Sequence, residues 1–326
     1  MKYRTLGCTG IEVSEIGFGS GGRHWLPAEE HSSREALAKS VSLGLNFIDT
    51  ALATGEGQSE KMLAPFLYGR LNGSDGKNCL RVATKIPPKN YAWPPQPGTR
   101  IDRVFPNDWI IGCTDRSLKS LGVETIDLQQ FHVWSPEWLG HQGWRETIMK
   151  LKRDGKIRAF GVSVNDHQPE SVRELVRSGL IDSIQLIFNI FDQSPTDGLL
   201  DVCAESGVGV IARCPFDEGS LAGVVHPETA FPPGDFRQNY FRGDRRRQVW
   251  ERVDQLQQAV APYGISVAEA ALRFCLSFSA VSCVVPGMRL ISYAERNCSA
   301  SDLGPLPPDL LEKLKAHRWQ RNFYGS

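Results

Sequence analysis

Three side chains suited to acid–base chemistry each come last in a short apolar stretch of the 326-residue sequence: Asp49, Lys85 and His132. In parallel α/β folds the carboxyl ends of the strands meet on one face, so we expect these three groups to lie together. Each of them is costly to bury without a partner. An Asp49–Lys85 ion pair beside His132 could simply fill the top of a barrel, and the same arrangement also suits proton transfer at a carbonyl or hydroxyl group.

A glycine-rich turn follows the first of these groups. The sequence reads Asn-Phe-Ile-Asp-Thr-Ala from residue 46 and Gly-Glu-Gly-Gln-Ser-Glu from residue 55. This pattern resembles the signature of the aldo-keto reductases, which use an Asp-Tyr-Lys-His tetrad for reversible hydride transfer between a nicotinamide and a carbonyl. The resemblance implies that Asp49 pairs with Lys85, that Lys85 lowers the pKa of the proton donor, and that His132 orients the carbonyl oxygen.

Thr54 stands directly before this turn, where the family carries its proton-donating tyrosine. A threonine hydroxyl is a far weaker acid than a phenol and reaches less far. Loss of a general acid costs about 10²–10⁴ in rate, so we expect catalysis at this position to be impaired or altered. Three replacement proton donors stay open: a water positioned by Thr54, His132 as the imidazolium, and Tyr91 from the loop after the third strand.

Later segments resemble the stretches with which the family binds its cofactor. They read Gly-Val-Ser-Val-Asn from residue 161, Ile-Gln-Leu from 184, Arg-Cys-Pro-Phe from 213, Gly-Ser-Leu from 219 and Val-Pro-Gly-Met-Arg from 285. The resemblance implies NADP(H), with Arg289 on the 2′-phosphate and Arg213 stacked on the nicotinamide. The cofactor-binding residues that it implies are Ser163, Asn165, Gln185, Arg213, Pro215, Phe216, Gly219, Ser220, Leu221, Pro286, Gly287, Arg289 and Asn297.

Two long loops are expected to form the walls of a small-molecule pocket. Residues 86–105 are rich in proline and aromatic side chains, and residues 217–244 follow the seventh strand. Loops of this length are uncommon unless they serve a function, and both leave the carboxyl ends of strands. Packing in the core or on the surface is the alternative for Trp134. The predicted pocket residues are His24, Trp25, Tyr91, Trp93 and Trp134.

The elements that must position these residues alternate along the chain. Eight short apolar runs, at 16–19, 46–49, 80–85, 126–132, 160–164, 184–189, 208–213 and 281–285, precede helical patterns. This alternation favours an α/β fold, a (β/α)8 TIM barrel in which residues 1–326 form a single domain, over an open doubly wound sheet. We expect an N-terminal β-hairpin over residues 1–13 and extra C-terminal helices after residue 286. Capping boxes at 32–35 and 266–269 predict two helix starts.

One motif is a false lead. Gly17, Gly19 and Gly22 match the G-x-G-x-x-G fingerprint of Rossmann folds. That fingerprint requires a helix that opens at once with its N-terminus toward the pyrophosphate, and residues 23–27 intervene here. We interpret these glycines as a crowded strand end.

Charge and cysteine content exclude several classes of function. The 37 Lys and Arg balance the 37 Asp and Glu, which argues against a nucleic-acid or membrane-surface partner. No apolar run approaches the ~18 residues of a membrane span, and no signal core follows the first residues, so we expect a cytoplasmic chain. The eight cysteines form no C-x-x-C pair and no zinc pattern, so no metal site is expected.

The sequence therefore predicts an NADPH-dependent oxidoreductase that acts on a small carbonyl, sugar or natural-product substrate or the corresponding alcohol. Two alternatives use the same scaffold. One is a redox-neutral enzyme, such as an epimerase, dehydratase or lyase, with Lys85 and His132 as acid and base. The other is a regulatory protein that binds NADPH and turns over slowly. Nothing in the sequence indicates the oligomeric state.

Overall fold

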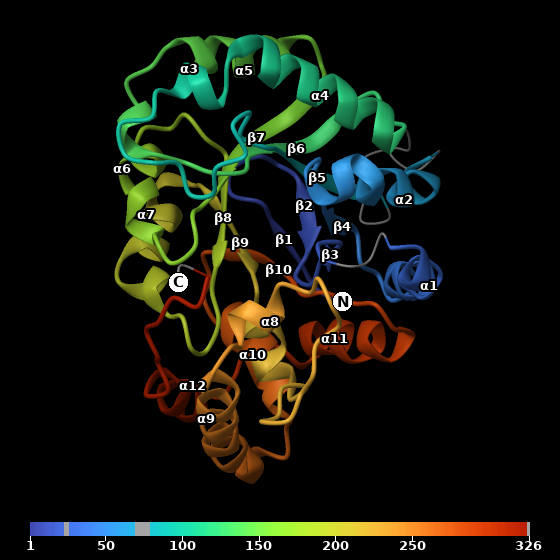
Figure 1. Cartoon of the computed structure of the whole chain (residues 1–326), viewed down its shortest axis with the longest axis vertical. Coiled ribbons are helices and arrows are strands. Elements are labelled where there is room, and N and C mark those ends of the chain that lie inside the picture. Colours follow the sequence, from blue (N-terminus) through green and yellow to red (C-terminus); the bar gives the residue numbers. More distant parts are fainter. Residues whose placement is uncertain (23–25, 69–78, 325–326) are drawn as a thin grey trace.

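A parallel eight-stranded sheet forms the centre of the molecule, and helices surround it (Figure 1). The computed structural model describes residues 1–22, 26–68 and 79–324. Each strand pairs with the next in chain order, which confirms the predicted (β/α)8 barrel. The strands are β3 Phe18–Gly19, β4 Phe47–Asp49, β5 Arg81–Ile86, β6 Ile126–Phe131, β7 Ile157–Ser163, β8 Ser183–Ile187, β9 Gly209–Arg213 and β10 Val281–Val285.

The barrel closes where the first strand meets the last. The Gly17 amide donates to the Val284 carbonyl at 2.8 Å, and the Gly19 amide donates to the Pro286 carbonyl at 3.1 Å. A Cβ atom on Gly19 would lie 2.8 Å from the carbonyl oxygen of Val285, which is closer than a real contact allows. Gly17 and Gly19 are therefore needed for the close approach of two strands, as interpreted from the sequence. The interpretation was wrong for Gly22, where an added Cβ atom would meet nothing within 4 Å.

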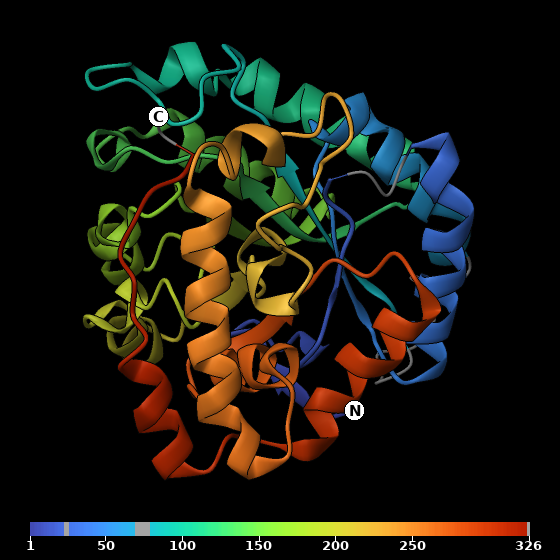
Figure 2. The same ribbon diagram turned by 60° about the horizontal axis from the view of Figure 1, so that its bottom comes forward.

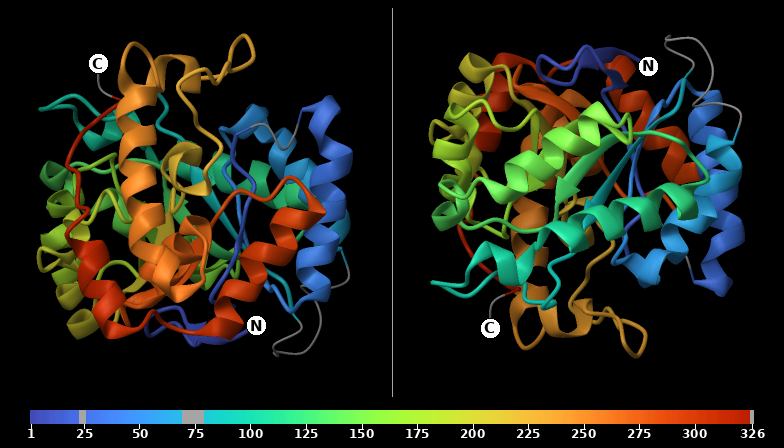
Figure 3. Two further views of the ribbon diagram at one scale, coloured as in Figure 1. Left: turned by 90° about the horizontal axis from the view of Figure 1, so that it is seen from below. Right: turned by 90° about the horizontal axis from the view of Figure 1, so that it is seen from above.

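An antiparallel hairpin covers the amino-terminal end of the barrel. It consists of β1 Tyr3–Thr5 and β2 Glu12–Ser14. In the left view of Figure 3 this dark-blue hairpin lies at the opposite end of the molecule from the gold loop that follows β9. Leu6 and Val13 of the hairpin segment join Phe47, Leu128 and others in a small apolar cluster inside the barrel. A larger cluster fills the space between strands and helices.

The connecting helices follow the predicted order. They are α1 Pro27–Ser42, α2 Gln58–Leu67, α3 Ile101–Val104, α4 Asn107–Leu121, α5 Gly143–Arg153, α6 Arg173–Arg177, α7 Leu199–Ser206, α8 Arg237–Tyr240, α9 Arg245–Val260, α10 Val267–Leu276, α11 Ile291–Leu303 and α12 Pro308–Lys315. Short 3₁₀ helices are η1 Thr54–Gly57, η2 Pro136–Trp138, η3 Pro169–Val172, η4 Ser194–Thr196, η5 Asp217–Ala222 and η6 Ala261–Tyr263.

The two predicted capping boxes had different outcomes. Ser266 caps α10, because its hydroxyl accepts a hydrogen bond from the Glu269 amide at 3.1 Å. The helix start predicted from the capping box at 32–35 was wrong, since α1 begins five residues earlier, at Pro27. Proline at the first helical position has its φ angle preset, and Glu29 in the first turn complements the helix dipole.

The long segment that follows β9 crosses the carboxyl end of the barrel. In Figure 2 this yellow-to-gold segment lies between α9 and α11, in front of the strands. Among residues 1–22, 26–68 and 79–324, no single helix is long and apolar enough to cross a membrane. One pair bent by 81°, residues 245–263 with residues 267–276, passes on length and composition alone. In the same described ranges, no group of three or more His, Cys, Asp or Glu side chains could hold a metal ion.

Candidate active site

A cavity of about 1480 Å³ occupies the carboxyl end of the barrel. Its lining includes Asp49, Thr54, Lys85 and His132, together with residues from the loop after β9 and from the start of α11. A cavity of this size at the carboxyl ends of the strands is where barrel enzymes bind their ligands. The four candidate catalytic residues are therefore brought into one space, although they come from three different strand–loop junctions.

The expected ion pair is present at the bottom of this cavity. Lys85 Nζ lies 2.7 Å from Oδ1 and 2.8 Å from Oδ2 of Asp49, and 2.9 Å from the carbonyl oxygen of Thr50. These contacts use the three donors of the ammonium group. Gln185 on β8 donates to Asp49 Oδ1 at 2.8 Å, so the carboxylate is held from a third strand. Both charged residues are buried, at 8% exposure for Asp49 and 4% for Lys85.

Burial lowers the pKa of Lys85 below its usual value, and the Asp49 carboxylate opposes that shift. Removal from water disfavours the charged ammonium, whereas the carboxylate favours it. Without Asp49 the lysine would therefore lose its main stabilising partner. The pair places a positive charge next to the cavity while the net charge of the pair stays zero.

His132 follows β6 and completes the group. Burial lowers its pKa well below the ordinary value, and the nearby positive charges of Lys85 and Arg213 lower it further. Its Nδ1 atom is buried without a hydrogen-bond partner among the described residues. Trp93 packs edge-on against the imidazole, with the ring centroids 5.8 Å apart. The ring is therefore neutral at physiological pH and can donate or accept one hydrogen bond in the cavity.

Thr54 begins the 3₁₀ turn η1 at the edge of the cavity and is half-buried. Its amide donates to the Ala51 carbonyl at 3.0 Å. The residues after it, Gly55 to Gly57, all have positive φ angles, which explains the glycines of the motif. The turn presents the side chain of residue 54 to the cavity, and in this chain that side chain carries a hydroxyl instead of a phenol.

Ten of the thirteen expected cofactor residues line the cavity; they are Ser163, Asn165, Gln185, Arg213, Pro215, Phe216, Gly219, Gly287, Arg289 and Asn297. The other three do not line it. Ser220 and Leu221 are buried residues of η5, at 1% and 0% exposure, and the Ser220 hydroxyl donates to the Asp217 carbonyl. Pro286 has its carbonyl engaged by Gly19 at the closure of the barrel. The sequence analysis placed these three residues at the cofactor because spacing along a turn does not show which side chains face the cavity.

Some of the expected cofactor contacts are instead made to protein groups. The Asn165 amide nitrogen donates to the Trp134 carbonyl at 2.7 Å, and its amide oxygen accepts from the Trp134 amide at 3.2 Å. Arg213 donates to Asp166 at 2.5 Å and to the Val164 carbonyl at 3.2 Å. The guanidinium plane of Arg213 is therefore fixed at the cavity wall by an acidic partner that the sequence patterns did not indicate.

At the other end of the cavity, Asn297 is 6% exposed, and its Nδ2 atom has no partner among the described residues. A buried donor of this kind is costly unless a ligand or water accepts its hydrogen bond. Arg289 lines the same cavity and forms an ion pair with Glu29 at 2.6 Å. Arg296 lies over the Tyr293 ring, 5.2 Å from its centroid. An unsatisfied amide and a guanidinium in the wall fit a polar nucleotide end, so the residues present are compatible with a dinucleotide.

The predicted pocket residues are placed differently from one another. Trp93 lines the cavity beside His132. Tyr91 is 61% exposed and is not among the lining residues. The prediction of Trp134 as a pocket residue was wrong, because its side chain is 1% exposed and packs edge-on against Trp138 and other rings of the core. His24 and Trp25 lie outside the described residues.

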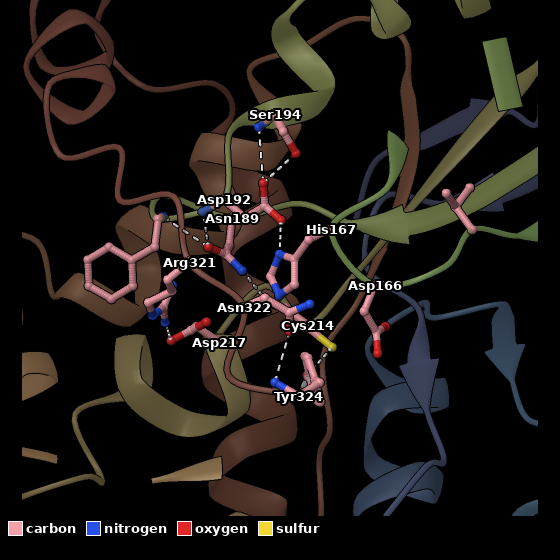
Figure 4. Close-up of polar contacts among 12 residues, drawn as sticks. Asp166, His167, Asn189, Asp192, Ser194, Cys214, Asp217, Arg321, Asn322 and Tyr324 are labelled. Carbon is pink, nitrogen blue, oxygen red and sulfur yellow. Dashed lines mark hydrogen bonds and ion pairs between the residues drawn. The ribbon is translucent and has the colours of Figure 1, made fainter. Parts of the chain in front are cut away.

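A further group of cavity residues was not predicted from the sequence. Tyr324 reaches the cavity from the end of the chain, and its hydroxyl donates to Glu218. The Cys214 thiol also donates to Glu218, at 3.3 Å, and burial raises the pKa of that thiol. Figure 4 shows Tyr324 and Cys214 meeting beside the carboxyl ends of the strands. The aromatic-rich ending of the chain was the one signal for this contact.

A second polar chain lies behind this group (Figure 4). His167 Nδ1 is 2.6 Å from Asp192 Oδ2, and the other oxygen of Asp192 accepts from the hydroxyl of Ser194 at 2.6 Å. The serine thus contacts the carboxylate and not the imidazole, which is unlike the order of a hydrolase triad. These contacts fix the loops after β7 and β8.

The comparisons with known proteins agree with this geometry. A model described as the Aldo/keto reductase family matches residues 15–318. The chain is 29% identical over 285 residues to aldo-keto reductase YhdN of Bacillus subtilis, covering 85% of this chain and 81% of that protein. It is 26% identical over 296 residues to aldo-keto reductase yakc [NADP(+)] of Schizosaccharomyces pombe, covering 88% and 84%. It is 25% identical over 320 residues to NADH-specific methylglyoxal reductase of Escherichia coli, covering 93% and 94%.

Among solved structures, aldo-keto reductase AKR11C1 from Bacillus halodurans in its holo form is similar over 99% of both chains, with a TM-score of 0.74 and 25% identity. The similarity therefore includes the hairpin, the barrel and the C-terminal helices. Because the family model covers nearly the whole sequence and the barrel carries the Asp–Lys–His group in its cavity, the chain belongs to the aldo/keto reductase family of oxidoreductases.

Proposed function

We propose that this protein is an NADP(H)-dependent oxidoreductase that interconverts a small carbonyl compound and its alcohol, with a rate limited by Thr54. One observation carries the proposal. The Lys85 ammonium is held against Asp49 in the wall of a cavity of about 1480 Å³ that also contains His132. A fixed positive charge and a neutral imidazole at one place are what a developing alkoxide requires.

Each residue has a distinct part in this proposal. The nicotinamide cofactor supplies or accepts the hydride. His132 orients the carbonyl oxygen through one hydrogen bond, and its depressed pKa keeps the ring neutral. Lys85 stabilises negative charge on that oxygen by proximity, because its hydrogen bonds go to Asp49 and Thr50. Trp93 covers one side of His132 and limits its contact with water.

The proton needs another carrier, since no phenol stands at residue 54. We favour a water held by the Thr54 hydroxyl. The low pKa of His132 makes the imidazolium scarce at neutral pH. Tyr91 is 61% exposed and lies outside the cavity lining, so it would have to move to take part. A water at Thr54 requires no rearrangement of the protein.

The preference for NADP(H) rests on Arg289, a guanidinium in the wall of the cavity that the Asn297 amide also lines, with Nδ2 lacking a partner among the described residues. A guanidinium matches the geometry of a phosphate group. The names of two relatives indicate different cofactors: the name of one includes NADP(+), and the other is called NADH-specific. We also propose a cytoplasmic location, because none of the eight cysteines, all of which lie in the described residues, forms a disulfide bond, as is usual in a reducing compartment.

The test compares the natural protein with Thr54→Tyr and Thr54→Phe. NADPH consumption is followed with a panel of aldehydes, ketones and sugars, and NADPH binding is measured on the same samples. We expect Thr54→Tyr to raise the rate by about 10²-fold or more, because it restores a general acid. Thr54→Phe adds the same ring without the hydroxyl and should not raise it. If all three proteins bind NADPH and none consumes it, the redox proposal is wrong.

That outcome would favour the second candidate, a redox-neutral enzyme. It has one supporting observation: the residue lost is the proton donor, while Lys85 and His132 remain in the cavity. An epimerase or lyase would convert a hydroxy-carbonyl substrate with no net change in NADPH. Product analysis by NMR, after incubation of sugars with the protein, distinguishes this activity from simple binding.

A further inference from the structure

We propose that Glu29 lowers the preference of this protein for NADP(H) over NAD(H), because it pairs with Arg289, the guanidinium that would bind the 2′-phosphate. The inference rests on the proposed function, and it concerns one subsite of the same cavity. Glu29 Oε2 lies 2.6 Å from Nη1 of Arg289, and both side chains line the cavity. The guanidinium that the proposed function assigns to the 2′-phosphate is therefore paired with a protein carboxylate.

The two partners come from elements that pack together. Glu29 is the third residue of α1, and Arg289 lies two residues before α11. Helices α1 and α11 lie side by side in both Figures 2 and 3. The side chains are 25% and 33% exposed, so the pair is partly shielded from water and still accessible to a ligand in the cavity. The contact thus joins the helix that follows the first barrel strand to the segment between the last barrel strand and α11.

The chemistry makes the carboxylate a competitor of the phosphate. A guanidinium binds both groups through the same fork of N–H donors. A 2′-phosphate must therefore displace Glu29 from Arg289 or accept its negative charge a few ångströms away. A ribose hydroxyl, in contrast, can donate to a carboxylate, as it does in NAD-binding sites. Glu29 thus weakens binding of the phosphorylated cofactor and leaves binding of NAD(H) unharmed.

Other cations at this end of the cavity are already engaged. Asp235 holds Arg237 through two contacts of 3.0 and 2.7 Å, and this guanidinium lies over the Phe231 ring. Arg237 is close enough to feel the charge of Glu29. Arg296 is exposed and lies over the Tyr293 ring. Among these three arginines, Arg289 is thus the one whose ability to bind a phosphate depends on Glu29.

The experiment titrates the protein with NADP⁺, with NAD⁺, and with 2′-AMP as a probe of the phosphate subsite alone, by isothermal calorimetry. The variant is Glu29→Gln, which keeps the shape and removes the charge. The control is Glu30→Gln, since Glu30 is the next residue on α1 and pairs with Arg34 outside the cavity. We expect Glu29→Gln to bind NADP⁺ and 2′-AMP about tenfold more tightly and NAD⁺ within about twofold of the natural protein. Glu30→Gln should change none of the three affinities.

Salt and a second variant sharpen the outcome. The gain should shrink as NaCl rises from about 0.05 to 0.5 M, because added salt screens the repulsion between the carboxylate and the phosphate. In an Arg289→Ala background, Glu29→Gln should improve NADP⁺ binding less than it does in the natural protein. Circular dichroism verifies that each variant is folded.

The negative results differ for the two proposals. If the natural protein binds both dinucleotides and Glu29→Gln leaves the ratio of NADP⁺ to NAD⁺ affinity unchanged, the role of Glu29 is wrong and the proposed function stands. If Arg289→Ala binds NADP⁺ as tightly as the natural protein does, the phosphate subsite lies elsewhere and this inference falls. If no form binds either dinucleotide, both proposals are overturned.

Discussion

At the scale of single residues, the Lys85 ammonium makes its hydrogen bonds to Asp49 and Thr50 and not to the side chain of residue 54. The three hydrogen-bond contacts of its ammonium all go to Asp49 and Thr50, and Gln185 supports Asp49 from β8. A phenol at residue 54 would have to recruit one of those donors to lower its own pKa. In the proposed function, with Thr54 at this position, the ammonium would act on the substrate through its charge alone. The structure thus contains the Asp49–Lys85 pair and has a threonine hydroxyl, not a phenol, at residue 54.

His132 gives a prediction on pH. Burial, with the charges of Lys85 and Arg213, lowers its pKa well below the ordinary value of 6.5. Between the folded pKa and 6.5 the unfolded chain binds a proton that the folded protein does not, so stability falls as the pH drops through that window. We expect the natural protein to lose about 1 kcal/mol more than His132→Gln between pH 7.5 and 5.5, because each pKa unit corresponds to about 1.4 kcal/mol.

Urea unfolding at both pH values measures this difference, and the other histidines contribute equally to the two proteins. The opposite sign, with the natural protein gaining stability at pH 5.5 relative to the variant, would mean that His132 is charged in the folded state. The imidazolium would then return as a candidate proton donor in place of the water at Thr54.

At the scale of elements, the chain end holds the loop after β9 in place. Arg321 forms a buried ion pair with Asp217 of η5, and its guanidinium lies 4.2 Å from the Trp319 ring centroid. Tyr324 donates to Glu218 in the same 3₁₀ helix. Figure 4 shows Arg321 against Asp217 and Tyr324 beside Cys214, both reaching in from the C-terminal tail. Since η5 contributes to the cavity lining, the tail helps to shape the site that it borders.

This contact predicts a result for Arg321→Met. The substitution leaves Asp217, which is 3% exposed, without its cationic partner, although Tyr240 still donates to it at 3.1 Å. Loss of one partner of a buried pair costs about 3–5 kcal/mol, so we expect a decrease of about 3 kcal/mol in the free energy of unfolding. We also expect weaker NADPH binding, because η5 would be free to shift. Denaturant unfolding and calorimetry measure the two effects.

The control is Arg318→Met in the same tail. Arg318 pairs with Asp197 on the surface, where the side chains are 35% and 53% exposed, and such pairs contribute about 1 kcal/mol or less. Equal effects of the two substitutions on NADPH binding would show that the tail acts only through general stability.

At the scale of the whole molecule, the two ends of the barrel have separate tasks. The cavity with its ionisable residues lies at the carboxyl end, and the hairpin closes the amino-terminal end (Figure 3). Arg4 of β1 joins that hairpin to the last barrel unit. Its guanidinium donates to Glu15 at 2.7 Å and to the carbonyls of Leu276, Phe278 and Val281 at 2.8, 3.2 and 2.7 Å.

Arg4→Met is therefore expected to lower stability and leave catalysis intact. It removes the donor to three carbonyls and to one oxygen of Glu15, whose other oxygen still accepts from the Ser301 hydroxyl at 2.8 Å. This loss should cost about 2–4 kcal/mol in the free energy of unfolding. The kcat/KM of the folded variant should stay within about twofold of the natural value, since the cavity is at the other end. Arg177→Met, which breaks an exposed pair with Glu174, is the matched control for both measurements. A large loss of kcat/KM at full folding would contradict the separation of tasks.

Local patterns were sufficient for the barrel and for part of the site. Apolar runs of strand length alternate with helical patterns, and parallel strands in one sheet must end on the same face. This rule is enough to place Asp49, Lys85 and His132 together from the order of residues along the chain. The capping box at Ser266 was likewise a local signal, because both of its partners lie within four residues.

The sequence by itself thus determined the fold, the family and the Asp–Lys–His group, since each of these depends on spacing along the chain. Only the tertiary structure decided that Trp134 is buried in the core, that Gln185 holds Asp49, and that Tyr324 reaches Glu218. The contact between Glu29 and Arg289 joins residues 260 positions apart. Which polar group meets which across a closed barrel depends on helix packing and loop direction, and no short-range pattern carries that information.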